Sequence, residues 1–446
     1  MKKINILLVV LFFTPFCHAQ SAWDGTTKTK PVVNGMKYTI TKPEHLAWVA
    51  DACATDEAAR EFEGKEVIID ADLDLGNKEW TPIGTPEHPF RGHVIGKNHT
   101  IKNLKISNAS LDYVGLFGYV KGQDASRAKI DSIYLTNSTI TGGNNVGTLC
   151  GSASNAEFIH IGVKTAALNG KTRVGGMVGT LKNSAISISY AKGITMTVTE
   201  EWGGLMVGYN DTIIRSTLKI NNCYAKGQIT CANHGGGFVG YNGFKGNIEH
   251  CYCIIRFAGK VADCKNLGLF CSVNEHNAKL NNCVYNNSVN GNMTSSPVYT
   301  NNNEMEDQVD VWDQSVESMK GLTFFTNFTA DQGAKGKWMQ DFSLPAGTGY
   351  AINEGTPILT WEYMANVSVK EADEVQVAIY PNPVQNMLSV KTNANIQKLE
   401  LMDLLGKTLM VQEEAESVNM GQFRAGIYLI RITTDQGTVT QKVIKK

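Results

Sequence analysis

Hydrophobic residues in this chain recur as short clusters framed by glycine, and the clusters return at a nearly constant interval. The first copy is Val114-Gly115-Leu116-Phe117-Gly118, and five similar copies follow it. The copies end at Gly118, Gly151, Gly179, Gly208, Gly240 and Cys271, so the steps between them are 33, 28, 29, 32 and 31 residues. A repeat of this length is typical of stacked units that are each too small to bury their own hydrophobic face.

A second pattern has the same period. It is a pair of mostly apolar residues three positions apart, and its first members are Ile101, Ile130, Phe158, Ile186, Ile220, Ile248 and Leu280. β-branched and aromatic residues are frequent around both patterns, whereas helical periodicity is absent. The two patterns therefore predict an all-β chain with a right-handed parallel β-solenoid over residues 101–290, whose neighbouring coils lie about 4.8 Å apart.

The glycine motif itself has a structural interpretation. A corner between two strands needs either a positive φ or room for a neighbouring backbone, and glycine supplies both. A phosphate-binding glycine loop would instead require a helix directly after the loop, and the sequence predicts none there.

Residues 20–100 are expected to cap the solenoid. Apolar residues at helical spacing predict one helix from Glu44 towards Ala58, directly after Pro43. The alternation from Val67 to Leu75 then predicts a strand with one buried face. Asp70, Asp72 and Asp74 share the other face, where they either bind Ca²⁺ or simply face solvent. No glycine-punctuated ligand loop surrounds them, which favours the solvated face.

The first 19 residues have the layout of a secretory signal peptide. Lys2 and Lys3 precede an apolar run from Ile4 to Phe16, and small residues around position 19 predict cleavage after Ala19. The run is shorter than the roughly 20 residues of a membrane span, and no later segment is long and apolar enough to cross a bilayer. The remaining chain is therefore expected to be exported without a transmembrane segment.

The charge balance limits the classes of partner. The formal net charge is −1, so no basic field indicates binding to nucleic acid or to an anionic membrane. The 43 glycines among 446 residues suit a chain with many tight turns, and this length makes two or more domains the expectation.

Three cysteines occupy one repeat position. Cys223, Cys251 and Cys283 stand where other copies have Ile133 and Ile161, which predicts a buried ladder of small hydrophobic side chains, although an exported chain also permits disulfides. A metal site at His250-Cys251-x-Cys253 is the weaker interpretation, because strand parity points His250 to the opposite face. No metal, cofactor or catalytic residue is predicted.

One exposed feature is predicted to repeat with the coils. Strand parity places the residues between the buried positions on the outside, and four of them are Tyr134, Tyr190, Tyr224 and Tyr252. An exposed tyrosine ladder either stacks on sugar rings or a protein partner, or stabilises the face of the solenoid. We keep these four tyrosines as a candidate binding face.

The repeat region resembles a known family. Asp74-Leu75, Trp80–Gly84, Phe90–Gly92, His99–Ile101 with Leu104, and Val114–Gly118 are similar to the GLUG-motif proteins, and the resemblance covers roughly residues 36–290. Those are repeat-bearing secreted and surface proteins of bacteria, some adhesin-like and some joined to a peptidase. The peptidase motif H-E-x-x-H is absent here, so the resemblance implies no peptidase activity. In similar proteins a segment such as residues 291–364 closes the solenoid.

The end of the chain forms a separate domain. Residues 365–376 are polar and read as a linker, and the short strands of residues 377–446 predict a small Ig-like β-sandwich. This domain resembles the type A C-terminal sorting domain of the type IX (Por) secretion system, which implies export in Bacteroidetes-like bacteria followed by release or attachment to surface lipopolysaccharide. The residues that match this motif are Tyr380, Pro381, Asn382, Pro383, Gly406, Gly426, Tyr428 and Lys442.

Two functions follow from these patterns. The first is a non-enzymatic, adhesin-like surface or secreted protein that binds a glycan or a host or matrix partner and uses the type IX secretion machinery for export. The alternative is a β-helix enzyme that degrades polysaccharides, a lyase or glycoside hydrolase, which would place acidic or basic catalytic residues on one face. No paired carboxylates recur at the predicted outward positions, which favours binding.

Overall fold

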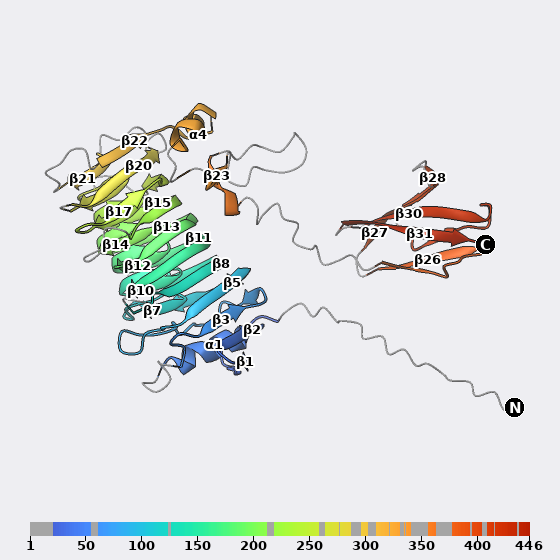
Figure 1. The fold of residues 1–446 in the computed structure, drawn as a ribbon, viewed down its shortest axis with the longest axis horizontal. Coiled ribbons are helices and arrows are strands. Elements are labelled where there is room, and N and C mark those ends of the chain that lie inside the picture. Colours follow the sequence, from blue (N-terminus) through green and yellow to red (C-terminus); the bar gives the residue numbers. More distant parts are fainter. Residues whose placement is uncertain are drawn as a thin grey trace. The chain divides into compact units, whose positions relative to one another are not determined.

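The computed structural model describes residues 21–446 apart from 55–60, 124–125, 212–217, 258–263, 276, 287–295, 302–308, 321, 331–333, 335, 340–355, 363–376, 393–394, 404–407, 414 and 435–436. The chain divides into two compact units, Met1–Ala365 and Asn366–Lys446, and each is described by itself (Figure 1). The expected signal peptide, its cleavage site at Ala19 and the expected linker at 365–376 lie outside the described residues.

The first unit contains a large sheet of fifteen strands. These strands are β1 (Val32–Asn34), β2 (Lys37–Ile40), β3 (Glu66–Ile69), β4 (Leu73–Asp74), β5 (His93–Lys102), β6 (Lys105–Ser107), β8 (Ala128–Thr141), β9 (Asn144–Gly147), β11 (Ala156–Gly175), β13 (Ala185–Gly204), β15 (Ile220–Gly236), β17 (Asn247–Glu249), β18 (Tyr252–Phe257), β20 (Lys279–Asn286) and β22 (Val309–Asp313). Its central order is β3-β5-β8-β11-β13-β15-β17-β20.

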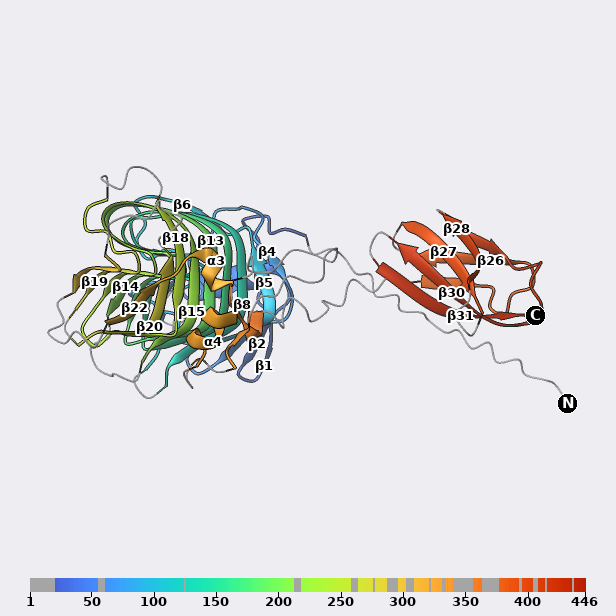
Figure 2. The ribbon, with the colours of Figure 1, turned by 90° about the horizontal axis from the view of Figure 1, so that it is seen from above.

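A second sheet of seven strands forms another wall of the same unit. Its strands are β7 (Phe117–Lys121), β10 (Cys150–Ser154), β12 (Val178–Lys182), β14 (Val207–Asp211), β16 (Val239–Asn242), β19 (Cys271–Asn274) and β21 (Val298–Asn301). Successive coils add strands in parallel to both sheets, as between β11 and β13 and between β12 and β14. The predicted parallel β-solenoid is therefore confirmed, and Figure 2 shows its coils stacked behind one another.

The ladder extends beyond the predicted limits of 101 and 290. The hairpin of β1 and β2 is antiparallel, but β2 already pairs in parallel with β3, and β3 pairs with β5. At the other end β22 adds a strand in parallel to β20. Helix α1 (Pro43–Ala52) follows β2, with a proline in its first turn where no amide hydrogen bond is lost. These outer strands lack the glycine motif, which is why the repeat alone did not predict them.

The interior is built from stacks of identical register positions. Ile130, Phe158, Ile186, Ile220 and Ile248 pair in register through successive coils, and each is at most 1% exposed. Burying one such side chain contributes about 1.5–3 kcal/mol relative to leaving it exposed. The second sequence pattern thus marks one row of the core.

Ile101, the first residue of the second sequence pattern, lies in a different row of the core from the other members. Ile101 is buried, but it pairs with Leu135 and not with Ile130, whose partner is Val94. The register shifts between Ile95 and His99, so the first coil contains an irregularity that spacing alone does not reveal.

The cysteine ladder lies inside as predicted. Cys223, Cys251 and Cys283 are fully buried free thiols, and burial raises the pKa of Cys251 well above its ordinary value. Cys231 and Cys264 form a disulfide between neighbouring coils, a pairing that the sequence left open.

The second unit is a small sandwich of two antiparallel sheets. One contains β25 (Val377–Tyr380), β26 (Met387–Thr392) and β29 (Ser417–Asn419), and the other contains β27 (Ile396–Met402), β28 (Thr408–Glu413), β30 (Gly426–Thr434) and β31 (Gly437–Lys445). Leu388 of the first sheet and Leu401 of the second belong to one buried cluster. This arrangement agrees with the predicted sandwich.

The motif residues of this unit have structural roles. The side chain of Asn382 donates to the carbonyl of Lys442 at 2.8 Å and accepts from the amide of Ile444 at 2.8 Å, so it holds the loop after β25 to β31. The Tyr428 hydroxyl donates to the carbonyl of Arg424 at 2.9 Å. Gly406, which also belongs to the predicted motif, lies outside the described residues.

Candidate ligand-binding site

The four predicted tyrosines lie in one row on the outside of the solenoid wall, and Gly162 separates the first from the other three. Tyr134 and Tyr190 both pair with Gly162, and Tyr190, Tyr224 and Tyr252 follow one another in register. The ring centroids of Tyr190 and Tyr224 are 5.2 Å apart and those of Tyr224 and Tyr252 are 5.0 Å apart, with nearly parallel planes. The predicted parity is therefore correct, because these rings cluster apart from the main core.

The prediction that this row is exposed is wrong. Tyr134 is 8% exposed, and Tyr190, Tyr224 and Tyr252 are 0% exposed. The described parts of residues 316–362, here called the covering segment, pack over them; they include α3 (Val316–Met319), α4 (Leu322–Phe328), β23 (Trp338–Met339) and β24 (Ile358–Leu359). The apolar faces of stacked rings are better buried than left in water, and this segment buries them.

Polar contacts fix the covering segment to the row. Glu362 is fully buried, and its carboxylate accepts from Lys192 Nζ at 2.6 Å and from the Tyr224 hydroxyl at 2.5 Å. The Tyr252 hydroxyl donates to the carbonyl of Pro357 at 2.6 Å. Burial, and then the nearby Glu362 carboxylate, raise the pKa of Tyr224 well above its ordinary value, so its hydroxyl remains a donor.

The covering segment runs back along the solenoid wall. At its start the Phe328 carbonyl accepts from the Asn282 side chain at 2.9 Å. At its end Trp361 stacks on Tyr134 with centroids 5.1 Å apart, and its indole N–H donates to Asn98 at 2.9 Å. Residues 291–364 were expected to close the solenoid: β21 and β22 of this stretch add strands at the end of the two sheets, and its later described part forms a lateral cover.

Replacing Lys192 with methionine tests this attachment. The variant leaves the Glu362 carboxylate buried without its cation, so the covering segment should lose about 3 kcal/mol of docking free energy. Amide hydrogen exchange within residues 316–362 measures this loss as faster exchange.

Lys164→Met is the matched control, because Lys164 pairs in register with Lys192 one coil earlier. This variant should change hydrogen exchange in the covering segment much less than Lys192→Met does. The Lys164 ammonium lies over the Tyr134 ring at 5.0 Å, and such a contact contributes about 0.5–1 kcal/mol at a partly exposed site. Equal protection of the covering segment in Lys192→Met and wild type would refute the role of this ion pair.

The aspartates of the N-terminal segment have partners from the next coil. The three contacts join Asp70 to Lys97 at 2.5 Å, Asp72 to His99 at 3.1 Å and Asp74 to the Asn103 side chain at 2.7 Å. Across the described residues, no group of three or more His, Cys, Asp or Glu side chains is placed to hold a metal ion. The three aspartates therefore contact side chains of the next coil on the face that the sequence analysis preferred as a solvated face rather than a calcium site.

A second row of side chains lines the corner before each glycine motif. We call it the corner row, and every member has a positive φ of 54–60°. Its members are Tyr113, Asn145, Arg173, Trp202, His234 and Asn266. This backbone region suits Asn, whereas large side chains enter it at a cost on the order of 1 kcal/mol.

The motif glycines make room for the corner row. A Cβ at Gly208 would lie 2.6 Å from the backbone of Arg173, and a Cβ at Gly240 would lie 2.9 Å from the backbone of Trp202. Neither glycine has a positive φ, so close approach and not backbone conformation requires glycine here. The repeat that defines the fold therefore also positions the corner row.

Arg173, Trp202, Tyr209, His234 and Tyr241 gather into one partly exposed cluster, which we call the Trp202 site. Tyr209 of β14 and Tyr241 of β16 stack with centroids 4.3 Å apart and planes 3° apart. The Trp202 ring stands at 70° to Tyr209 and 67° to Tyr241, at 5.3 and 6.1 Å. Because the two tyrosine faces lie against each other, Trp202 meets their edges.

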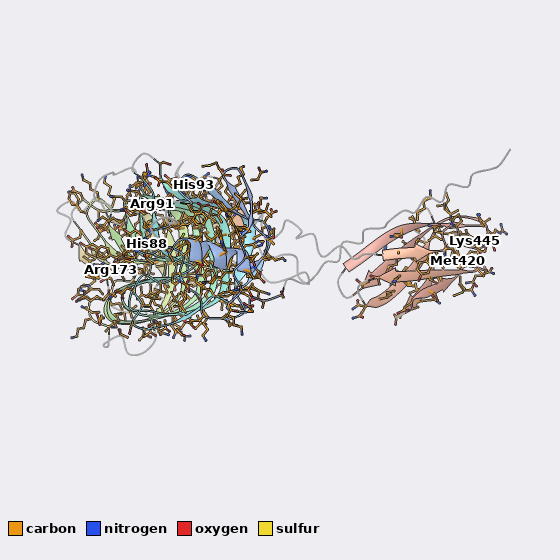
Figure 3. All side chains as sticks on the ribbon, turned by 90° about the horizontal axis from the view of Figure 1, so that it is seen from below. His88, Arg91, His93, Arg173, Met420 and Lys445 are labelled. Carbon is orange, nitrogen blue, oxygen red and sulfur yellow. A yellow bond between two sulfur atoms is a disulfide. The ribbon has the colours of Figure 1, made fainter. Side chains whose placement is uncertain are left out.

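Arg173 completes the cluster from the preceding coil. Its guanidinium carbon lies 4.9 Å from the centroid of Tyr209 and 5.6 Å from that of Trp202. Figure 3 labels Arg173 among the side chains of the solenoid unit. No carboxylate of the described residues lies within 4.0 Å of this guanidinium. Its charge is therefore held by aromatic rings and is not neutralised by an ion pair.

His234 and Tyr241 are neutral at physiological pH, whereas carboxylates lie near the tyrosine hydroxyls: Asp211 near Tyr209, and Glu275 near both Tyr209 and Tyr241. Partial burial lowers the pKa of His234, and the Glu201 carboxylate opposes this shift only in part. Burial also raises the pKa of Tyr241, so its hydroxyl stays protonated. Among the described residues, the Trp202 site thus combines a cation that has no ion-pair partner within 4.0 Å with aromatic rings, neutral hydrogen-bonding groups and the nearby carboxylates of Glu201, Asp211 and Glu275.

The sequence contained a signal for this site in the residues that precede the glycine motifs. The alternation of inward and outward residues along the strands does not reveal it. The residue directly before each Val-Gly or Gly-Gly motif is a corner residue, and reading these positions in order gives aromatic or cationic side chains in the middle coils. The contacts of Trp202 with Tyr209 and Tyr241 also required the register of the smaller sheet.

The architecture defines a parallel β-solenoid followed by a separate sandwich, and comparison with known proteins identifies the second part. Residues 378–446 match the family model for the secretion system C-terminal sorting domain. The sorting domain indicates export by the type IX secretion system.

A stretch of 106 residues is 36% identical to Halomucin of Haloquadratum walsbyi; it covers 24% of this chain and 1% of that protein. No solved structure matches the chain. Within the described part of the chain, no helix is long and apolar enough to cross a bilayer.

Proposed function

We propose that this protein is adhesin-like: it is exported through the type IX route and binds a glycan through the Trp202 site. The observation that carries this proposal is the partly exposed cluster of Trp202, Tyr209 and Tyr241 around Arg173. Aromatic rings with polar edges supply the large apolar contact and the hydrogen bonds that sugar rings require.

Backbone strain supports a functional interpretation of the same residues. Asn145 and Asn266 occupy the corner position in other coils, and asparagine tolerates a positive φ. Trp202 and Arg173 adopt this positive φ at a higher conformational energy than asparagine would, although the fold accepts asparagine at this position in other coils. Strained residues of this kind cluster at ligand sites.

Surface attachment is also part of the proposal. The sorting domain indicates secretion through the type IX machinery. We propose that the sorting domain is of type A, that it is removed after export, and that the solenoid then remains at the surface, for instance on lipopolysaccharide, where the Trp202 site faces other cells or a matrix.

The alternative function is a polysaccharide-degrading enzyme. Glycoside hydrolysis requires two carboxylates on opposite sides of the scissile bond. Around the Trp202 site the chain provides Glu201, whose Oε1 accepts from the Asn233 side chain at 3.4 Å, and the carboxylates of Asp211 and Glu275 near the tyrosine hydroxyls. We propose binding without catalysis on the strength of the aromatic cluster, and release of new reducing ends from a bound glycan would favour the enzyme instead.

A glycan array with the full-length protein tests the proposal. The wild type should bind a subset of glycans, and Trp202→Asn should lose about tenfold in affinity, because aromatic contacts contribute about 0.5–1.5 kcal/mol. Tyr299, an exposed tyrosine of β21, supplies the control variant Tyr299→Asn, which should bind like the wild type. A wild type that binds no glycan, or an unchanged Kd for Trp202→Asn, would overturn the proposal.

A further inference from the structure

Arg173 differs from the charged residues that elsewhere stabilise the solenoid. Arg127, also on the solenoid, lies 3.6 Å from the Glu157 carboxylate and donates to the carbonyl of Asn183 at 2.7 Å. Arg173 has aromatic neighbours in place of such partners, and its Nε atom is buried without a hydrogen-bond acceptor among the described residues. The aromatic rings hold the guanidinium in place without accepting conventional hydrogen bonds from its N–H groups.

Positive and negative side chains near Arg173 belong to different coils. Lys171, within β11, and Lys182, the last residue of β12, are exposed and belong to the same coil as Arg173. The next coil instead presents Glu201, which pairs in register with Thr172, and Asp211, which pairs in register with Lys182, and Glu275 lies near the Tyr241 hydroxyl. A ligand that contacts these coils therefore meets cations on one side and carboxylate acceptors on the other.

This pattern fits a ligand that carries single negative charges separated by hydroxyl groups. A carboxylate accepts two parallel hydrogen bonds from a guanidinium, and sugar hydroxyls donate to an acid such as Glu201. A densely charged polymer would be repelled by Glu201 and gains no attraction from a chain of net charge −1.

We infer that the ligand of the Trp202 site is an acidic polysaccharide, with a hexuronate carboxylate on Arg173 and its sugar ring against Trp202. This inference rests on the proposed glycan binding and adds the chemical class of the glycan. Arg173 is then the residue that selects the charged sugar, whereas Trp202 contributes to the binding of any sugar at this site.

Three polymers separate the possible outcomes: polygalacturonate, its methyl ester and dextran sulfate. The ester keeps the sugar backbone and removes the charge, and dextran sulfate offers a dense array of sulfates. The full-length wild type should bind polygalacturonate about ten- to hundredfold more tightly than the ester, as expected for a hydrogen-bonded charged group. It should bind dextran sulfate more weakly than polygalacturonate.

Variants at Arg173 identify the residue responsible. Arg173→Asn should lose the preference for polygalacturonate over the ester, so that it binds the two polymers with similar affinity. Arg173→Lys keeps the charge without the planar fork, so it should retain only part of the preference. Lys37→Gln, at an exposed lysine of β2, changes the net charge equally and should leave the preference intact.

Asparagine is chosen for this variant so that a loss of stability cannot explain a change in binding. Because Asn145 and Asn266 stand at the same corner position, Arg173→Asn should melt at the wild-type temperature or above it. Equal affinity of the wild type for the acid and the ester would overturn this inference and leave glycan binding intact. Stronger binding of dextran sulfate would replace carboxylate recognition by general charge attraction, and the absence of all glycan binding would overturn the proposed function as well.

Discussion

Replacing Cys251 with aspartate should lower the free energy of unfolding of the solenoid unit by about 2–5 kcal/mol. Cys251 is fully buried in the ladder between Cys223 and Cys283, and its sulfur lies 3.1 Å from the carbonyl of Glu249 and 3.6 Å from that of Ile220. A carboxylate there would face two carbonyl oxygens without a cation. Thermal and denaturant unfolding of the purified protein measures the effect.

A serine at the same position is the control that the repeat itself provides. Ser189 is the register partner of Cys223 and occupies the same row, and its hydroxyl donates to the carbonyl of Ser187 at 2.7 Å. Cys251→Ser should therefore cost about 1 kcal/mol or less, because a hydroxyl at this position has an acceptor. An aspartate variant as stable as the serine variant would show that position 251 is not inside.

Deleting residues 377–446 should abolish appearance of the protein at the surface or in the medium. Residues 378–446 match the sorting domain, and the sandwich has its own buried core, so its removal leaves the solenoid unit intact. The truncated protein should accumulate in the periplasm of a host with a functional type IX system. Immunoblots of periplasmic, outer-membrane and medium fractions measure the distribution.

The reciprocal experiment controls for misfolding of the truncated chain. An unrelated periplasmic reporter joined to residues 366–446 should be exported by the same host. Wild-type amounts of the truncated protein outside the cell would contradict the assigned role of this domain.

Much of the fold follows directly from the repeat. The row from Ile130 to Ile248 and the cysteine row are fixed by spacing, because every coil must place the same position inwards. Parity also placed Tyr190 and Tyr224 on the outer side of the wall. These are local rules, and each coil repeats them.

The errors concern contacts between segments that are distant in sequence. Whether Tyr224 meets water or Glu362 depends on a segment 138 residues away, and no periodicity encodes that contact. The Trp202 site was missed because Arg173, Trp202 and Tyr209 come from different coils and sheets, so only the register between them forms the cluster.

The course of the covering segment has a consequence for how the solenoid unfolds. In a stack of coils each unit contacts only its neighbours, so such proteins can fray from their ends. The segment bridges from Asn282 in a late coil to Asn98 in an early one, and the latter contact spans 263 residues of sequence. Because one segment contacts several coils, opening one of these coils disturbs the docking of the segment on the others, and we expect them to unfold together.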